Sequence, residues 1–228
     1  MKIKMIVTDL DGTLLRDDKT VSEFTKSALQ RCRAAGIKTI FATGRGENSI
    51  CGVEHVVPTE LFDGYILNNG ALAVAEHDTV YSRFVVEDMI KPLLAVCEEM
   101  GLEHSFSRHG IEIGKFWAFG CTPEISTLIE ARLGDGLHLK VARDGLGQIM
   151  HKDATKANAV SALARHWNIN QSEIIAFGDD LNDIDLLNYA GCGVAVANAL
   201  DEVRAIAKYI CDTNENDGVA KWLEEKVL

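Results

Sequence analysis

The sequence predicts an α/β protein in which a second, α+β domain is inserted into a doubly wound parallel sheet. Short apolar segments at residues 3–8, 37–42, 64–67, 174–177 and 193–196 each run into a polar loop. Helical patterns separate these segments, and strands joined by helices of this length form parallel sheets with right-handed crossovers. The middle of the chain instead carries hairpin signals, which are typical of antiparallel pairing.

The amino-terminal elements illustrate the pattern. Residues 3–8 are rich in strand formers and end abruptly at an acidic loop. Ser22 is suited to cap a helix whose apolar positions begin at Phe24, and Gly36 is placed to end that helix. Residues 37–42 then form a second buried strand. Because ligands bind open α/β sheets at the carboxyl ends of the strands, we expect the loops after the five segments to face one another.

The middle of the chain repeats an α-β-β pattern. We predict a strand at 80–86, helices at 87–100 and 123–133, and further strands at 102–107, 111–117, 137–143 and 146–150, with turns at 108–110 and 144–145. Hairpins of this kind indicate a separate α+β domain. We therefore assign residues 1–78 and 152–228 to the parallel core domain and residues 79–151 to the insert.

Composition excludes several classes of partner. The 228 residues carry a formal charge of −11, which repels polyanions such as nucleic acid at long range. No apolar run approaches the roughly 20 residues that cross a bilayer. The six cysteines form no CxxC unit, which favours buried, reduced thiols. We expect a cytoplasmic protein that binds neither nucleic acid nor membrane.

The loop at residues 9–13 places Asp9 and Asp11 two positions apart, directly after a buried strand. Like charges at short range raise each other's pKa, and a divalent cation is the usual means of keeping both carboxylates ionised. The alternative for such a loop on its own is an Asp-Gly turn with solvated carboxylates. This loop does not stand alone, because functional groups follow the later strands as well.

Thr43, Gly44 and Arg45 follow the second strand. They offer a hydroxyl donor, a position where backbone can approach a ligand, and a guanidinium that can hold an anion through two hydrogen bonds. Lys156 follows a helix cap at Thr155, where a lysine opposes the helix dipole and needs a reason such as an anion in front of it. The alternative for Lys156 is a solvated surface lysine.

Residues 178–183 bring three carboxylates and an amide together after another strand: Asp179, Asp180, Asp183 and Asn182. This density of hard oxygen ligands is suited to Mg²⁺. Calcium loops share the oxygen-rich character, but an EF-hand needs a glycine at its sixth position and a glutamate at its twelfth, which this stretch lacks.

Taken in order, these loops resemble the four motifs of the haloacid dehalogenase (HAD) superfamily of phosphohydrolases. The corresponding residues are 9–13, 43–45, 156 and 178–183. The resemblance covers essentially the whole chain and implies a Rossmann-like core. The insert, together with residues 69–71 and 213–220, is similar to the Cof-type subfamily IIB, whose cap domain is called C2. The insert is shorter than in most Cof-type sugar phosphatases and closer to compact members such as archaeal phosphoglycolate phosphatases and phosphomannomutases.

The resemblance implies a role for each acidic residue. Asp9 would attack phosphorus and become an aspartyl phosphate, and Asp11 would act first as general acid and then as general base. Mg²⁺ would be bound by the carboxylates of Asp9 and Asp179 and by the backbone carbonyl of Asp11, while Asp183 would orient the metal-bound waters.

The remaining residues are expected to bind substrate. Thr43 and Lys156 would hold the phosphoryl oxygens and so share in catalysis. Further contacts are expected from Gly44, Arg45, Asn69 and Asn182 in the core and from Arg108, His109 and Lys115 in the insert, which would close over the site.

These residues together imply a Mg²⁺-dependent phosphomonoester hydrolase that acts on a small soluble phosphorylated metabolite, with a sugar phosphate preferred, as a monomer or homodimer. The alternatives within enzymes are a phosphoglycolate-type phosphatase and a phosphomutase. A response-regulator receiver combines similar residues but lacks an inserted domain and the second aspartate. A catalytically silent binding protein is the remaining alternative, although every motif position holds a competent residue.

Overall fold

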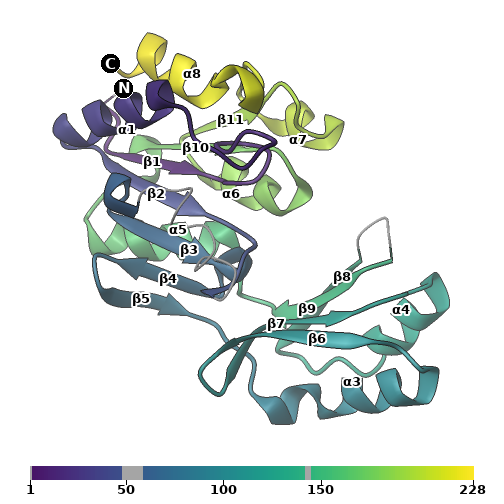
Figure 1. The fold of residues 1–228 in the computed structure, drawn as a ribbon. Helices are drawn as coiled ribbons and strands as arrows, with labels where there is room; N and C mark the ends of the chain where they lie inside the picture. Colours follow the sequence, from purple (N-terminus) through teal and green to yellow (C-terminus); the bar gives the residue numbers. More distant parts are fainter. Residues whose placement is uncertain (1, 48–58, 142–144) are drawn as a thin grey trace.

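The computed structural model describes residues 2–47, 59–141 and 145–228, and these form two sheets with separate apolar cores (Figure 1). The larger sheet has the strand order β12-β11-β10-β1-β2-β3-β4-β5, and the smaller one has the order β6-β7-β9-β8. All pairs from β12 to β3 are parallel, whereas the smaller sheet is antiparallel throughout. The predicted fold class is confirmed.

The parallel part of the larger sheet supplies most of the core. Its strands are β1 (Met5–Thr8), β2 (Lys38–Ala42), β3 (Gly64–Leu67), β10 (Ile174–Gly178), β11 (Cys192–Val196) and β12 (Tyr209–Cys211). Every residue of β1, β10 and β11 is buried, as expected for strands covered on both faces. The apolar runs predicted from the sequence are therefore the central strands of the sheet.

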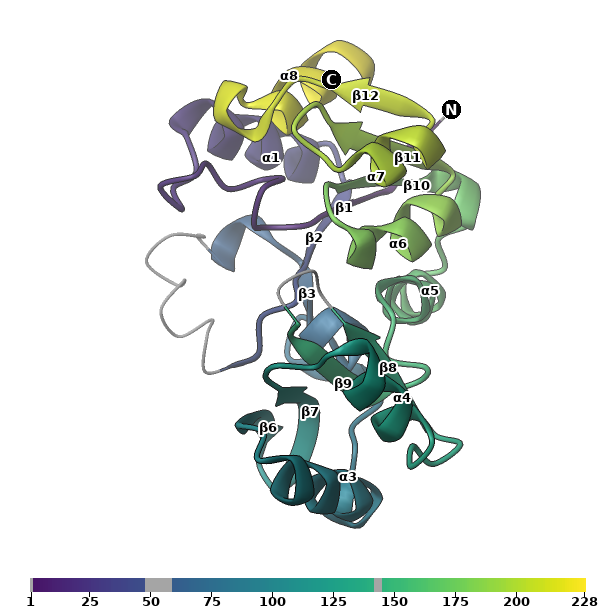
Figure 2. The same ribbon diagram turned by 90° about the vertical axis from the view of Figure 1, so that its right-hand side faces the viewer.

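Helices cover both faces of this sheet (Figure 2). The helices α1 (Glu23–Ala34) and α8 (Gly218–Lys226) contact each other on one face. The other face carries α5 (Lys156–His166), α6 (Ile184–Tyr189) and α7 (Asp201–Ile206), which also contact one another in sequence order. None of the helices in the described ranges is long and apolar enough to span a bilayer.

The start of α1 confirms one prediction and corrects another. The Ser22 side chain accepts a hydrogen bond from the backbone N–H of Thr25 and so caps the helix as predicted. Phe24, which was expected on the buried face, is 43% exposed, and Thr25 is buried in its place. The hydroxyl of Thr25 reaches Asp217 at 3.2 Å, so a polar contact with the carboxyl-terminal region sets the inward face of the first turn.

An antiparallel hairpin closes one edge of the larger sheet. The strands β4 (Leu72–Ala75) and β5 (Asp78–Ser82) pair with each other, and β4 pairs with β3. The expected strand at 80–86 is therefore shorter and belongs to the core sheet rather than to the insert. β4 was not predicted, because its four small and apolar residues follow Asn-Asn-Gly and read as loop. The division of the chain at 79 and 151 stays a prediction.

The insert forms the smaller sheet and two helices, α3 (Glu87–Met100) and α4 (Pro123–Glu130). Its strands are β6 (His104–His109), β7 (Glu112–Ala118), β8 (Leu137–Val141) and β9 (Gly147–His151). The predicted helix at 87–100 is confirmed, while α4 ends three residues before the predicted 133. The turn predicted at 144–145 lies partly outside the described residues. Figure 1 shows both helices on the side of the small sheet that faces away from the core sheet.

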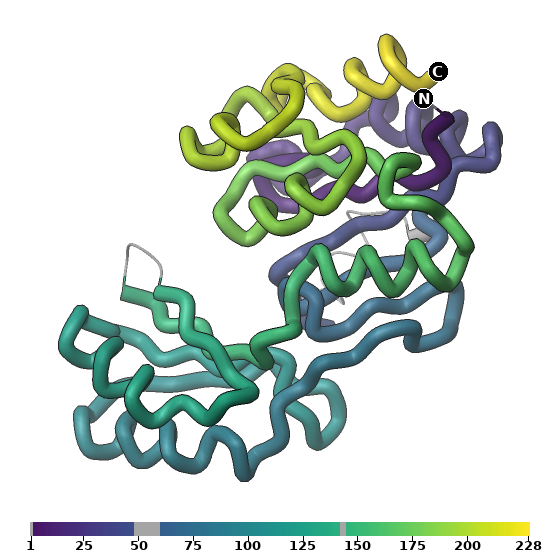
Figure 3. The backbone as a smooth tube through the Cα atoms, turned by 180° about the vertical axis from the view of Figure 1, so that it is seen from behind, coloured from purple at the N-terminus to yellow at the C-terminus, as the bar shows by residue number. Residues whose placement is uncertain are grey.

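The chain passes between the two sheets twice, once after β5 and once after β9 (Figure 3). The end of β5 contacts the second connection, because the Tyr81 hydroxyl donates to the carbonyl of Asp153 at 2.8 Å. Ala71, Met150 and Ala154 form a small buried cluster at this junction. These contacts fix where the insert attaches to the core.

The five cysteines within the described residues are free and buried: Cys32, Cys97, Cys121, Cys192 and Cys211. Burial raises the pKa of the Cys32 thiol to about 11, so it stays protonated at neutral pH. This agrees with the expectation of inert, reduced thiols. Cys51 lies outside the described residues.

Gly70 fixes the position of α5, and we predict that Gly70→Ala is strongly destabilising. Gly70 has φ of +106°, and an added Cβ would lie 2.1 Å from the carbonyl oxygen of Thr155, the residue that caps α5. Strain and overpacking together should lower the free energy of unfolding by about 3 kcal/mol or more.

The matched control is Gly101→Ala, at φ of +65° with open space around the added atom. It should cost about 1 to 2 kcal/mol, from backbone strain alone. Denaturant unfolding of the two variants measures the difference, and equal losses would contradict the role given to the contact between Gly70 and α5.

Candidate active site

The carboxyl ends of four strands meet at one edge of the larger sheet. Asp9 follows β1, Thr43 follows β2, Asn69 lies just after β3, and Asp179 follows β10. The parallel registers of these strands bring the loops together although they are far apart in sequence. A cleft of about 180 Å³ opens between them, lined by Asp9, Asp11, Thr43, Gly44, Arg45, Asp179, Asp180 and Asn182.

A buried lysine lies between two buried aspartates behind this cleft. The Nζ atom of Lys156 is 2.5 Å from Oδ1 of Asp9 and 2.5 Å from Oδ1 of Asp183. The side chains of Lys156 and Asp183 are fully buried. Lys156 begins α5, so the anion that the sequence calls for in front of it is supplied by the protein itself.

The charges in this cluster shift one another's pKa. Burial alone would lower the pKa of Lys156, but Asp183 and Asp9 outweigh burial and raise it. Lys156 is therefore a permanent cation. Burial raises the pKa of Asp9 well above its usual range, and Lys156 only partly opposes that effect. The single positive charge of Lys156 does not balance the carboxylates of Asp9 and Asp183 when both are ionised, so the cluster has a net negative charge.

Asp179 adds a third carboxylate to the cluster. One carboxylate oxygen from each of Asp9, Asp179 and Asp183 lies within 4.8 Å of the others. Burial raises the pKa of Asp179 to about 6, although the Thr13 hydroxyl donates to it at 2.5 Å. Gly12 permits the approach of Asp179, because a Cβ there would lie 2.5 Å from Oδ2 of that residue.

These residues fit a divalent cation. Hard carboxylate oxygens are the ligands that Mg²⁺ prefers, and its charge would offset the burial and the repulsion that raise the pKa values of Asp9 and Asp179. Asp183 differs from the other two aspartates. Its Oδ1 contacts Lys156, and its Oδ2 accepts the backbone N–H groups of Asp179 and Asp180 at 3.0 and 3.2 Å. Asp183 therefore shapes the loop that presents Asp179.

The carboxylate of Asp11 lies outside this acidic cluster. Arg45 holds it through two hydrogen bonds of 2.6 Å, and Nζ of Lys19 lies 3.0 Å away. Partial burial raises the pKa of Asp11, but Arg45 and Lys19 outweigh burial and hold it below its usual range. Arg45, expected to bind a substrate anion, is thus engaged by Asp11 here. The expected contact of the Asp11 backbone carbonyl with metal stays a prediction.

Thr43 presents a free hydroxyl hydrogen at the cleft. Its Oγ1 accepts the backbone N–H of Arg45 at 3.1 Å, and no acceptor for its own hydrogen is found among the described residues. The side chain is only 1% exposed, so its orientation is fixed by packing. Thr43 is therefore prepared to donate to an oxygen of a bound ligand.

Asn182 lines the cleft as a neutral side chain and pairs with Asn69. The Asn182 amide donates to Oδ1 of Asn69 at 3.0 Å, and Asn69 has a left-handed backbone with φ of +56°. The Oδ1 atom of Asn182 is buried and has no hydrogen-bond partner among the residues that the structure describes. A buried acceptor without a donor is costly, and a ligand hydroxyl would satisfy it.

The predicted residues of the insert reach the core to different extents. Lys115 donates to the carbonyl oxygen of Gly44 at 3.1 Å, and Nδ1 of His109 lies 2.7 Å from the carboxylate of Glu47. Both contacts join a strand of the insert to the segment that follows β2 in the core. Arg108 instead stacks on the Phe106 ring at 5.0 Å and is exposed, so the structure does not bring it to the cleft.

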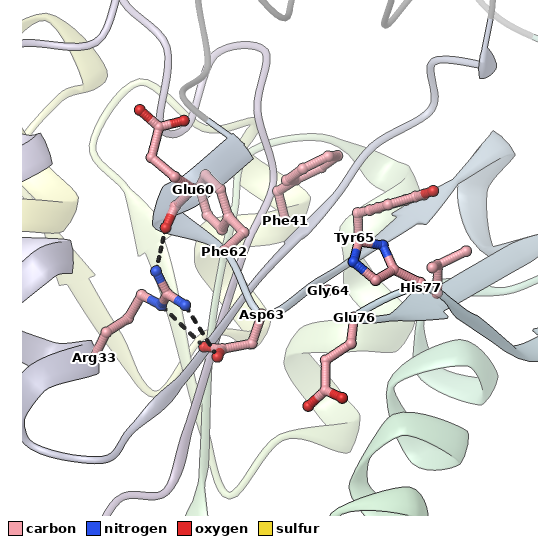
Figure 4. A pocket seen from close by; sticks show the side chains of 10 residues that line it. Arg33, Phe41, Glu60, Phe62, Asp63, Gly64, Tyr65, Glu76 and His77 are labelled. Atoms are coloured by element: carbon pink, nitrogen blue, oxygen red, sulfur yellow. Dashed lines mark hydrogen bonds and ion pairs between the residues drawn. The ribbon is translucent and has the colours of Figure 1, made fainter.

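A second and larger hollow, of about 560 Å³, does not share this chemistry (Figure 4). It lies near the amino end of β3, away from the ends of the strands that carry the aspartates. Figure 4 shows its central charges already paired, with Arg33 directed at Asp63 and at the carbonyl of Glu60. We therefore take the smaller cleft as the candidate active site.

Three residues that support the candidate active site were not predicted from the sequence. Thr13 bonds Asp179, Lys19 pairs with Asp11, and Asp185 accepts the backbone N–H of Ala157 at the start of α5. Thr13 is the last residue of the acidic loop at 9–13 and could have been suspected from that position. Lys19 and Asp185 carry no local signal, because each reads as an ordinary solvated charge.

Comparison with known proteins places these features in a family. A model described as haloacid dehalogenase-like hydrolase matches residues 6–114 and 112–223. The 5-amino-6-(5-phospho-D-ribitylamino)uracil phosphatase YitU of Bacillus subtilis is 29% identical over 262 aligned positions, which cover 97% of this chain and 96% of that protein.

Solved structures share the fold over nearly the whole chain. BT1666 from Bacteroides thetaiotaomicron, a phosphatase of the HAD superfamily, is 24% identical with a TM-score of 0.86, covering 98% of this chain and 95% of that one. The HAD subclass IIB sugar phosphatase BT4131 is also 24% identical, with a TM-score of 0.83, covering 97% and 98%.

The acidic cluster predicts that Mg²⁺ stabilises the protein in a pH-dependent manner. Because the folded-state pKa of Asp179 is raised above its unfolded value, the metal-free protein should lose stability as pH rises from about 4 through 6. Above pH 6 the ionised carboxylate should bind Mg²⁺, and a hundredfold excess over Kd would contribute about 2.7 kcal/mol.

Thermal unfolding with and without Mg²⁺ measures this effect. The increase in Tm should be clear at pH 7.5, weak at pH 5, and lost in Asp179→Asn. Asp88→Asn, which changes an exposed aspartate on α3, should retain it. A full increase in the Asp179 variant would show that the ion binds elsewhere.

Proposed function

The chain belongs to the haloacid dehalogenase-like hydrolase family and is a phosphatase, and we propose that it hydrolyses a phosphomonoester of a small metabolite through an aspartyl phosphate on Asp9. The observation that carries this proposal is the arrangement around Asp9. Its Oδ1 is fixed by Lys156, while its Oδ2 has no hydrogen-bond partner among the described residues and belongs to a residue that lines the cleft. One oxygen is thus positioned and the other is available to attack.

In the first step Oδ2 of Asp9 attacks phosphorus in line, and the bond from phosphorus to the ester oxygen breaks. In the second step water attacks phosphorus, the acyl phosphate bond breaks, and phosphate leaves with the carboxylate of Asp9 restored. A Mg²⁺ ion bound by Asp9 and Asp179 would neutralise phosphoryl charge in both steps. Burial favours the protonated form of Asp9, whereas the permanent charge of Lys156, together with a bound cation, would favour the ionised form that attacks.

Asp11 serves as the proton carrier in this proposal. It must protonate the leaving alkoxide and later accept a proton from water, but Arg45 and Lys19 favour its ionised form in the unliganded protein. Arg45 therefore has to exchange Asp11 for an oxygen of the substrate before the acid step. Losing those two hydrogen bonds returns the pKa of Asp11 toward a value at which it can carry a proton.

Thr43 binds a phosphoryl oxygen through its free hydroxyl hydrogen. Phosphoryl transfer depends mainly on positioning and on stabilisation of charge, and a preorganised donor is typically worth about 2.7 to 4 kcal/mol of barrier. Lys156 contributes from behind Asp9, where its charge also faces the phosphoryl group.

The substrate is a small phosphorylated metabolite, and we favour a sugar phosphate. A cleft of about 180 Å³ accommodates a phosphate with a few adjoining atoms, and the Oδ1 atom of Asn182, which lines the cleft, can accept a hydrogen bond from a hydroxyl group. The buried free thiols agree with a cytoplasmic enzyme. The chain would act as a monomer or homodimer.

We predict that Asp9→Asn reduces turnover to below about one-thousandth of wild type, because the amide cannot form the phosphoenzyme. The assay is release of inorganic phosphate from p-nitrophenyl phosphate with Mg²⁺ present. Asp78→Asn, an exposed aspartate in β5, is the matched control. Unchanged circular dichroism would show that the Asp9 variant is folded.

Normal turnover by the folded Asp9 variant would refute the nucleophile assignment. Transfer of the phosphoryl group to a sugar without release of phosphate by the wild type would indicate a mutase.

We predict that Asp11→Asn separates the two steps. p-Nitrophenolate leaves without protonation, so the variant should release one equivalent in a burst, whereas steady-state turnover should fall roughly 10²-fold to 10⁴-fold because water is not activated. The increase in Tm on adding Mg²⁺ should remain. Loss of that increase would instead show that the Asp11 side chain is needed to bind the metal.

A further inference from the structure

Lys115 is a buried cation that the mechanism above does not use. It lies on β7 of the insert, is 3% exposed, and reaches the core through its hydrogen bond to Gly44, a residue that lines the cleft. The Nζ atom of Lys115 also lies 5.6 Å from the centroid of the Trp117 ring. The side chain therefore extends from the insert to the rim of the candidate active site.

An irregularity in β7 directs Lys115 toward the core. The register between β6 and β7 shifts between Ser107 and Arg108, which leaves an extra residue near Gly114. As a result both Ile113 and Phe116 belong to the apolar core of the insert, which strict alternation in a strand would not allow. After the shift, Lys115 lies on the other face of the small sheet, away from α3 and α4.

Gly114 lets the bulge approach the core closely. A Cβ at this position would lie 2.5 Å from the side-chain nitrogen of Asn68, which follows β3 directly. The bulge is thus packed against the loop that carries Asn69. Because the backbone at Gly114 packs directly on Asn68, the position of the neighbouring Lys115 relative to the cleft is fixed.

The charge of Lys115 is not compensated within the described part of the chain. Lys156 has two carboxylate partners, and Arg45 has Asp11, but no carboxylate of a described residue pairs with Lys115. Burial, with repulsion from Lys156 and Lys140, lowers the pKa of Lys115 to about 7. An unpaired buried charge costs several kcal/mol, so such a group is expected where a ligand supplies the counter-charge.

We propose that Lys115 binds a second anionic group on the leaving-group side of the substrate, either a carboxylate or a phosphate. The inference rests on the proposed function. The phosphoryl group that is transferred lies against Asp9 and Thr43, and Lys115 approaches from the insert across the Gly44 carbonyl. A sugar or polyol phosphate that carries an acid group or a second phosphate would place its charge there, and a neutral sugar phosphate would leave Lys115 unpaired.

Matched substrate pairs test this proposal. 6-Phosphogluconate against glucose 6-phosphate tests a carboxylate, and fructose 1,6-bisphosphate against fructose 6-phosphate tests a second phosphate. Wild-type kcat/KM should favour the anionic member of at least one pair. Lys115→Met, which keeps an unbranched side chain of similar length and removes the charge, should lower kcat/KM for that member on the order of 10-fold to 100-fold. The neutral member should change by less than about 3-fold.

Lys91→Met is the control, since Lys91 is an exposed lysine of α3 and carries the same charge. It should leave both members unchanged. Removing an unpaired buried charge should also leave the Tm of Lys115→Met no lower than that of wild type. The proposal would be overturned if Lys115→Met had a lower Tm and lost kcat/KM equally for both members of each pair. That result would mean that Lys115 only joins the insert to Gly44.

A wild-type preference for the neutral member of both pairs would likewise overturn it, while hydrolysis of p-nitrophenyl phosphate would leave the proposed function standing. Failure of the wild type to hydrolyse p-nitrophenyl phosphate and all four metabolites with Mg²⁺ would count against both.

Discussion

The buried pairing of Lys156 with Asp9 and Asp183 is the constraint on which the rest of the site depends. A charge that is removed from water is costly unless it is paired with good geometry. The three residues come from the start of α5, the end of β1 and the loop after β10, so the pairing requires these elements to meet. The parallel sheet brings the three elements together, and the contact of Gly70 with Thr155 sets the position of α5.

The cations around the cleft differ in how fully they are paired, and this difference suggests a division of roles. Lys156 has two buried partners and cannot leave them at small cost, so it positions Asp9. Arg45 binds Asp11, which is partly exposed, and such a pair can exchange for a ligand. Lys115 has no carboxylate partner among the described residues and is the group that most needs a ligand anion. Arg45 and Lys115 can thus offer positive charge to an anionic ligand although the chain as a whole is acidic.

The insert contributes to the cleft through a few close contacts. The bulge near Gly114 packs against Asn68, and Tyr81 of β5 donates a hydrogen bond to Asp153 in the second connection between the sheets. Two links and a packed bulge restrict the insert to a limited set of positions over the cleft. In an enzyme built in this way, substitutions on the face of the small sheet can alter which substrate binds, while the aspartates of the core stay in place.

Local signals in the sequence determined the parallel core, the helix caps at Ser22 and Thr155, and the side chains that converge at the edge of the sheet. Apolar runs and caps act over a few residues, so they can be recognised without a structure. Tertiary structure alone decided the pairing of Arg45 with Asp11, 34 residues away, the β4–β5 hairpin and the isolation of Lys115. The partners of a side chain depend on how segments that are distant in the sequence pack together. Residue type and local spacing do not determine that packing.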